Sequence, residues 1–234
     1  MTHVKIIYED RDVIVIDKPA GVIVHPVKSA DEPSLLDEFR DKIDPRGFPA
    51  LRPGVVHRLD ADTSGVLILA KNSNSAVLLS AQFKNRTVKK SYLALVHGKL
   101  EPAEGMIDLP VGRTARGGNR MSVYGGRGKD SRTSYKVIAT AGSLSLLRLG
   151  LHTGRTHQIR AHLLAIGFPI LGDKTYGSPS RDKRAGITLN RQFLHASTLE
   201  LTLPSGQNTK FASPLPKELH SILTKVGLYL PGEK

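Results

Sequence analysis

The spacing of hydrophobic residues along the chain predicts where its strands and helices lie. Runs of aliphatic and β-branched residues, either continuous or alternating with polar ones, are typical of strands. Such runs occupy residues 4–10, 12–18, 66–70, 91–100, 132–140, 143–151 and 193–204. Helical spacing is found in residues 34–43, 74–86 and 155–167. Ser34 is placed to cap the first of these helices, and Gly167 to end the last.

The order of these elements favours an α+β fold. The predicted strands outnumber the helices and do not alternate with them. A mixed, mostly antiparallel sheet flanked by helices therefore fits better than a doubly wound parallel sheet. Residues 4–10 and 12–18 are separated by a short polar turn, which predicts a hairpin. Because no linker, low-complexity tail or internal repeat interrupts the pattern, we expect a single domain over residues 1–234.

Composition narrows the range of chemistry. The chain has 34 Lys and Arg against 21 Asp and Glu, a formal net charge of +13, and no Cys. Without Cys, disulfide frameworks, thiolate zinc sites and sulfur nucleophiles are excluded. The first residues do not have the form of a signal peptide, and no apolar run approaches the roughly 18 residues of a membrane helix. We expect a cytoplasmic protein that does not enter a membrane.

The positive charge is concentrated in two parts of the chain. The segment 113–132, rich in Gly and Arg, is expected to form a long hairpin or mobile loop able to close over an extended ligand. Its candidate nucleic-acid-binding cations are Arg116, Arg120, Arg127 and Lys129. The second cluster, opposed only by Asp182, consists of Arg181, Lys183, Arg184 and Arg191. Such local excess favours a polyanionic partner, and a disordered insertion without a role stays the alternative for residues 113–132.

The turn "HRLDADTSG", residues 57–65, first suggests a calcium loop. Asp60, Asp62, Ser64 and Gly65 fall on positions 1, 3, 5 and 6 of the EF-hand pattern. Position 12, which should supply a bidentate Glu, is Lys71, and the following "VLILA" predicts a buried strand where an EF-hand has a helix. An ammonium group at that position would repel the ion, so calcium is excluded.

A zinc site is not indicated either. His157 and His162 are five residues apart, which places them about 140° apart around a helix, whereas zinc-binding helices use a spacing of four. His57 lies close in sequence to Asp60 and Asp62, but it brings no third ligand at compatible spacing. We therefore expect no metal.

A turn that presents one reactive carboxylate explains residues 57–65 better. Loops that enter a buried strand commonly expose reactive side chains, and Asp60 holds that position. The short polar side chains of Asp62, Thr63 and Ser64 are suited to building the turn. An ordinary turn aspartate is the alternative for Asp60.

Several motifs together resemble the RluA-type pseudouridine synthases. Residues 57–72, "HRLDADTSGVLILAKN", are similar to the family signature H-R-L-D-x-x-[TS]-S-G. The supporting motifs appear in the family's order and cover most of the chain. They are "KPAGVIVHP" (18–26), "KKSYLALVHG" (89–98), "GRTHQIRAHLLAIGFPILGDKTYG" (154–177) and "FLHASTLEL" (193–201).

The resemblance implies an isomerase that needs no cofactor and no metal and converts uridine in RNA to pseudouridine. Asp60 would be the essential catalytic carboxylate. Arg160 would lie near it, lowering its pKa and orienting it, although a helix-surface Arg is the alternative. Tyr92 would stack on the target base, whereas a strand Tyr is more often part of a core.

Two further roles follow from the same resemblance. Arg58 would fill the place left by a flipped uridine, with a phosphate contact as the alternative. Ile159 would line the pocket or pack in the core. His57 and His157 are expected to be structural.

The nature of the RNA is left open by the sequence. Many relatives carry an N-terminal S4-type RNA-binding domain, whereas here the first predicted strand begins almost at Met1. RNA selection would then fall to the catalytic domain of residues 1–234 and its basic loops. We expect a monomer without an obligatory protein partner, acting on a stem-loop of rRNA, tRNA or both, in rRNA or tRNA processing.

A non-catalytic RNA-binding or ribosome-assembly protein is the main alternative, because the charge pattern predicts it equally well. A uridine methyltransferase lacks its usual Cys nucleophile, and a zinc deaminase lacks its P-C-x-x-C motif.

Overall fold

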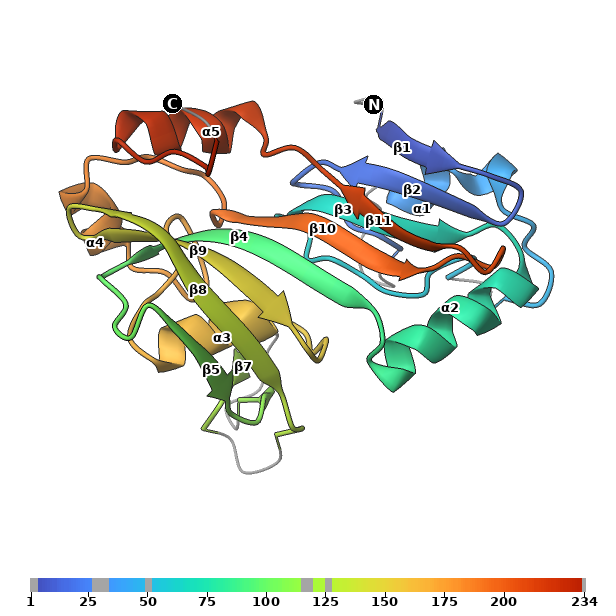
Figure 1. Cartoon of the computed structure of the whole chain (residues 1–234), viewed down its shortest axis with the longest axis horizontal. Helices are drawn as coiled ribbons and strands as arrows, with labels where there is room; N and C mark the ends of the chain where they lie inside the picture. Colours follow the sequence, from blue (N-terminus) through green and yellow to red (C-terminus); the bar gives the residue numbers. More distant parts are fainter. Residues whose placement is uncertain (1–3, 27–33, 49–51, 115–119, 125–127, 233–234) are drawn as a thin grey trace. The chain divides into compact units, whose positions relative to one another are not determined.

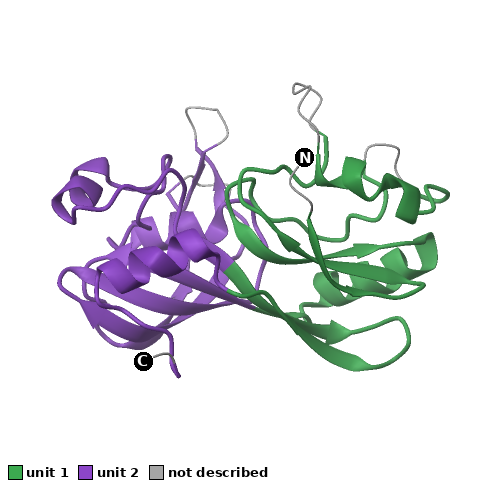
Figure 2. Ribbon diagram, turned by 90° about the horizontal axis from the view of Figure 1, so that it is seen from above, with its two compact units in different colours: residues 1–90, 196–214 green, residues 91–195, 215–234 purple. Residues whose placement is uncertain are grey.

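The computed structural model describes residues 4–26, 34–48, 52–114, 120–124 and 128–232, and the chain forms two compact units. Unit 1 comprises residues 1–90 and 196–214, and unit 2 comprises residues 91–195 and 215–234 (Figure 2). The chain passes between the units within two strands, β4 (Lys89–His97) and β10 (Leu194–Thr202), and a third time between Pro214 and Leu215. The single catalytic domain expected over residues 1–234 stays a prediction.

Unit 1 is built on a sheet with the strand order β1-β2-β3-β10-β11. Its further strands are β1 (Lys5–Glu9), β2 (Val13–Lys18), β3 (Ser64–Ala70) and β11 (Asn208–Ala212). The pairs β1–β2, β2–β3 and β10–β11 are antiparallel, and the predicted β1–β2 hairpin is thereby confirmed. Every residue of β3 is buried, as its continuous apolar sequence predicts.

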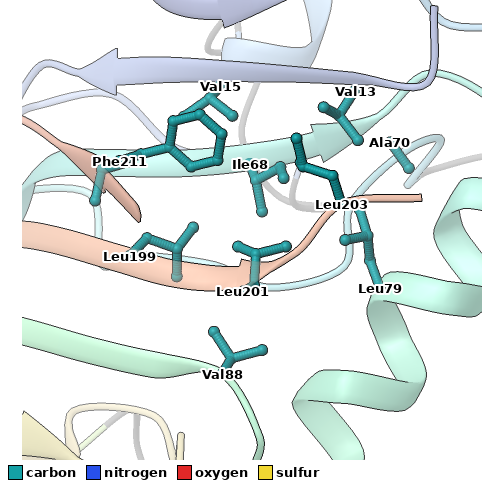
Figure 3. Packing of buried hydrophobic residues seen from close by; sticks show 11 residues of the cluster. Val13, Val15, Ile68, Ala70, Leu79, Val88, Leu199, Leu201, Leu203 and Phe211 are labelled. Carbon is teal, nitrogen blue, oxygen red and sulfur yellow. The ribbon is translucent and has the colours of Figure 1, made fainter. Parts of the chain in front are cut away.

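One face of this sheet carries the core of unit 1 (Figure 3). Val13 pairs with Ala70 and Val15 with Ile68, so that their side chains share a face. Leu79 of helix α2 (Ser73–Asn85) packs on that face. The other members of the cluster are Val66, Val88, Leu199, Leu201, Leu203 and Phe211. Each large aliphatic side chain buried here contributes about 1.5–3 kcal/mol, which makes β3 a rigid base for the turn that precedes it.

The helices of unit 1 begin at polar caps. At α2 (Ser73–Asn85), the side chain of Asn72 accepts a hydrogen bond from the Ser75 N–H at 2.9 Å. At α1 (Leu35–Glu38), the N–H and the hydroxyl of Ser34 each donate to the Asp37 carboxylate at 2.8 Å. The predicted cap at Ser34 is confirmed, but the single helix predicted over residues 34–43 breaks into α1 and a 3₁₀ turn, η1 (Arg40–Lys42).

Unit 2 contains a sheet with the order β4-β9-β8-β5, whose described pairs β4–β9, β9–β8 and β8–β5 are antiparallel (Figure 1). Its strands besides β4 are β5 (Glu104–Asp108), β8 (Arg132–Ala141) and β9 (Leu144–Leu151). Two short strands, β6 (Gly112–Arg113) and β7 (Met121–Ser122), pair separately. Its helices are α3 (Gln158–Ala165), α4 (Pro179–Arg184) and α5 (Lys217–Lys225).

The helix predicted over residues 155–167 is shorter at its start. His157 has a left-handed backbone with φ 55°, so the helical turns of α3 begin only at Gln158. Gly167, with φ 89°, follows the end of α3 as predicted.

The mostly antiparallel α+β fold predicted from the sequence is confirmed. In segment 113–132, the pairing of β6 with β7 agrees with the predicted hairpin, whereas Arg116 and Arg127 lie outside the described residues. Among the residues that the structure describes, no helix is long and apolar enough to cross a membrane.

Candidate active site

Asp60 lies in a turn that enters β3 in unit 1. The Thr63 N–H donates to the Asp60 carbonyl at 3.1 Å, which closes the turn, and the side chain of Leu59 is buried beneath it. Thr63 and Ser64 are almost completely buried, whereas Asp60 is only half-buried. This agrees with the prediction that the short polar residues after Asp60 build the turn.

The chain before Asp60 is fixed by His57. Its Nε2 accepts a hydrogen bond from the Ile68 N–H of β3 at 3.1 Å, and its ring stacks on Phe83 with centroids 4.5 Å apart. Desolvation, together with the nearby charge of Lys90, lowers the pKa of His57 to about 3. The imidazole is therefore neutral and an acceptor at physiological pH, and the structural role predicted for His57 is confirmed.

The chain after Asp60 is fixed by Lys18, which the sequence analysis missed. The Lys18 ammonium group is completely buried and donates to the carbonyls of Pro19 at 2.8 Å, Ala61 at 2.7 Å and Thr63 at 3.1 Å. The Ala61 carbonyl also accepts from the Gly21 N–H at 2.9 Å. A charged donor that holds carbonyls on the turn makes strong hydrogen bonds in this dry environment. Asp60 is thus held between two anchors, His57 and Lys18.

Gly65 is required where β3 begins. Its φ of 125° is rarely adopted by other residues, and a Cβ atom at this position would collide with the backbone of Ala196 in β10. The Gly of the "TSG" motif therefore permits the close approach of β10 to the strand that follows the Asp60 turn.

We predict that Lys18→Met loosens the Asp60 turn. The free energy of unfolding of the variant should be lower than that of the wild type by about 1–3 kcal/mol, because the carbonyls of Pro19, Ala61 and Thr63 lose their charged donor. Hydrogen exchange of the Thr63 amide should become faster than in the wild type. The matched control is Lys71→Met, which removes another ammonium that donates to a backbone carbonyl of unit 1, that of Asp10. Equal exchange at Thr63 in both variants would contradict a specific role for Lys18.

In unit 2, Arg160 on α3 forms a buried ion pair with Asp173. Arg160 Nε lies 2.6 Å from Asp173 Oδ2, and Nη2 lies 2.9 Å from Oδ1. The two side chains are 8% and 0% exposed, which excludes the alternative of a helix-surface Arg. Burial opposes ionisation of Asp173, but the hydrogen bonds and charge of Arg160 outweigh it and hold the Asp173 pKa below its usual range.

Tyr176 connects this ion pair to the basic segment 113–132. Its ring centroid lies 4.9 Å from Arg160 Cζ and 5.3 Å from Arg120 Cζ, within the range of cation–π attraction. Its hydroxyl oxygen accepts from the Met121 N–H at 2.6 Å and lies 3.0 Å from His157 Nδ1. Sequence reasoning missed Tyr176, although its place in the "GDKTYG" end of a recognised motif was a signal.

The first turn of α3 is attached to β8 through Gln158. Its amide oxygen accepts from the Thr153 hydroxyl at 2.7 Å and from the Arg155 N–H at 3.0 Å. Its amide nitrogen donates to the Arg132 carbonyl at 3.1 Å and to the Thr133 hydroxyl at 3.0 Å. These contacts fix the start of the helix that carries Arg160.

The other predicted site residues occupy varied positions. Tyr92 in β4 and Ile159 in α3 are buried in unit 2, whereas Arg58 is exposed in unit 1. Lys129 is exposed, and its backbone exchanges hydrogen bonds of 3.0 Å with Val111 at the base of the basic segment. The expected proximity of Arg160 to Asp60 joins residues of different units and stays a prediction.

Comparison with known proteins gives consistent results. Residues 12–165 match the family model described as RNA pseudouridylate synthase. The chain is 45% identical over 226 residues to a ribosomal large subunit pseudouridine synthase D of Nitrosomonas europaea, covering 95% of this chain and 65% of that protein. It is 39% identical to an uncharacterized RNA pseudouridine synthase of Bacillus subtilis, covering 93% and 71%.

The fold of the chain is similar to that of a solved human structure over nearly its whole length. The human RNA pseudouridylate synthase domain containing 4 matches with a TM-score of 0.76 and 27% identity, covering 97% of this chain and 95% of that one. The chain spans 65% of the length of the N. europaea relative.

Proposed function

Because the chain belongs to the RNA pseudouridylate synthase family, we propose that it isomerises uridines in structured RNA to pseudouridine. The observation that carries the proposal is the Asp60 turn, whose backbone is held by His57 on one side and by Lys18 on the other. Preorganisation of this kind holds a reactive carboxylate in place without reorganisation during the reaction.

One carboxylate is sufficient for this chemistry. The N1–C1′ bond of uridine breaks, the base turns, a C5–C1′ bond forms, the C5 proton is lost and N1 gains a proton. No water enters and no group departs, whereas hydrolysis of a glycosidic bond generally uses two carboxylates. Two roles fit Asp60: it attacks the substrate as a nucleophile, or it takes the 2′ proton to give a glycal.

The other site residues are given separate roles in this proposal. Arg160 is proposed to orient the reactive carboxylate, and its buried pairing with Asp173 supports a fixed guanidinium. Tyr92 is proposed to stack on the target base, with Ile159 lining the pocket. Arg58, which is exposed, is proposed to occupy the space of the flipped uridine.

We further propose that the basic segment binds the RNA backbone through its cations. The exposure of Arg120 and Lys129 supports this role. The residues assigned to this contact are Arg116, Arg120, Arg127 and Lys129.

Large-subunit rRNA is the proposed substrate, because the N. europaea relative is named as a pseudouridine synthase of the ribosomal large subunit. A tRNA stem-loop is the second candidate from the sequence. We propose that the protein acts in the cytoplasm as a monomer and uses neither a cofactor nor a metal.

The proposal is tested by tritium release. Large-subunit rRNA and tRNA transcripts labelled with tritium at uridine C5 are incubated with the purified protein. We expect release from rRNA up to the number of modified sites, because formation of the C5–C1′ bond displaces the label. If RNA is bound and neither transcript releases tritium, the protein is a non-catalytic RNA-binding protein.

A further inference from the structure

The segment 174–190 of unit 2 exposes four cations, whereas its single carboxylate, that of Asp182, is mostly buried. The acidic residues in and beside it are turned toward buried partners: Asp173 pairs with Arg160, and Asp182 Oδ1 accepts from His97 Nε2 at 2.6 Å. The His97 side chain is 3% exposed and that of Asp182 20%. The exposed cations of the segment are Lys174, Arg181, Lys183 and Arg184.

Helix α4, which carries three of these cations, is not held by a hydrophobic face. None of its residues is buried, and like charges three residues apart, as at Arg181 and Arg184, disfavour a helix. Asp182 attaches α4 to β4 through His97, and the Gly172 N–H lies 3.4 Å from the same carboxylate oxygen. The fold thus uses the one acidic residue of α4 as an internal anchor and leaves its cations outside.

Backbone hydrogen bonds also fix the C-terminal end of α4. The Gly186 N–H donates to the Lys183 carbonyl at 3.0 Å and the Ile187 N–H to the Asp182 carbonyl at 3.2 Å, the pattern of a Schellman cap. Lys225 of α5 donates to the Gly186 carbonyl at 2.8 Å and adds a further cation at this end. The α4 surface is therefore defined as Arg181, Lys183, Arg184 and Lys225.

The structure corrects the composition of the second basic cluster seen in the sequence. Arg191 is only 6% exposed, and its Nε lies 2.5 Å from Glu218 Oε1. Its charge is used inside the fold and does not contribute to the α4 surface.

The chemistry of the α4 surface fits the phosphate backbone of RNA. Several exposed cations elsewhere on the molecule are paired with carboxylates, as Arg11 is with Asp12 and Lys89 with Glu200. At α4 the cations are close in sequence and their only acidic neighbour is turned inward. The helix has no apolar face that could enter a lipid surface, so nucleic acid is the polyanion that fits.

We propose that the α4 surface is an RNA-backbone contact, separate in sequence from segment 113–132. This inference rests on the proposed function, because RNA is the expected substrate. Its role is to hold phosphates of the substrate and thereby to increase affinity without taking part in bond rearrangement.

The test compares two triple variants of the full chain. The first is Arg181→Gln, Lys183→Gln and Arg184→Gln. The second removes the same formal charge from cations paired with carboxylates in unit 1, Arg11→Gln, Lys42→Gln and Lys89→Gln. A fluorescein-labelled RNA hairpin with a uridine-containing loop is titrated at several salt concentrations.

We expect the α4 variant to flatten the slope of log Kd against log salt by about 2, since each lost phosphate contact removes about 0.7–0.9. The control should keep the wild-type slope. Equal slopes for the α4 variant and the wild type would overturn the proposal, as would equal flattening in both variants. Tritium release by the wild type is measured in parallel, so a failure of the proposed isomerase activity is seen separately from a failure of the α4 contact.

Discussion

Asp60→Asn is expected to reduce tritium release at least about 10³-fold, while RNA affinity changes by less than about twofold. The amide has nearly the same shape as the carboxylate, but it is neutral and neither attacks carbon nor accepts the 2′ proton. The backbone anchors of the turn, His57 and Lys18, remain in place. Affinity should persist because phosphate contacts supply most of it. Release is measured under single-turnover conditions, and affinity by titration with unlabelled RNA.

The matched control for this prediction is Asp62→Asn. It makes the same change of charge in the same turn, at a residue assigned to the frame of the turn. We expect tritium release by this variant to stay within about tenfold of the wild type, because Asp62 helps to form the turn that positions Asp60 and does not itself react. If Asp60→Asn turned over RNA as fast as Asp62→Asn, Asp60 would not be the reactive group.

The strands that support the Asp60 turn were predictable because each contains a continuous run of aliphatic residues, which is typical of a buried strand. The continuous apolar runs "VIVI" (13–16) and "VLILA" (66–70) lie in the buried strands β2 and β3, which pair in one register. The role of Gly65 was visible only as part of a motif. Glycine is required at this position because the backbone of Ala196 approaches it closely, and Ala196 lies in a strand more than a hundred residues later in the chain.

Lys18 and α4 show why other features were not predicted. A buried Lys is unusual because charged groups are more stable in water. Lys18 is stabilised by hydrogen bonds to the carbonyls of Ala61 and Thr63, which lie 43 and 45 residues later in the chain. The pattern of α4 has no apolar stripe, so helical periodicity gives no signal for it. Its anchor is Asp182 on His97, a contact between residues 85 positions apart.

The Arg160–Asp173 ion pair gives the second large expected effect. Arg160→Met should lower the free energy of unfolding at pH 7 by about 3–5 kcal/mol, because the completely buried Asp173 carboxylate loses its partner. Urea unfolding monitored by circular dichroism measures this loss. The double variant Arg160→Met with Asp173→Asn should regain at least half of the lost stability, because the Asn is neutral and keeps an acceptor for the N–H groups of Thr175 and Tyr176.

The pH dependence distinguishes this ion pair from simple packing. In the wild type the Asp173 pKa is lowered, so its contribution to stability is present above its usual pKa of about 3.9 and is lost as the pH falls toward the folded value. In Arg160→Met, burial raises the pKa of the carboxyl, and the hydrogen bonds from the Thr175 and Tyr176 N–H groups oppose it only in part. The difference in stability between wild type and variant should therefore shrink below about pH 4. A difference that stays constant between pH 7 and pH 3 would contradict an electrostatic origin.

Activity separates the structural role of Arg160 from its proposed role in the reaction. The double variant Arg160→Met with Asp173→Asn should remain folded yet release tritium at least about 10²-fold more slowly than the wild type. Arg160→Lys keeps a positive charge but not the planar fork that meets both Asp173 oxygens, and intermediate release is expected. If the double variant regained both stability and full release, Arg160 would serve the fold alone, and the orientation of the reactive carboxylate would have to come from the anchors of its own turn.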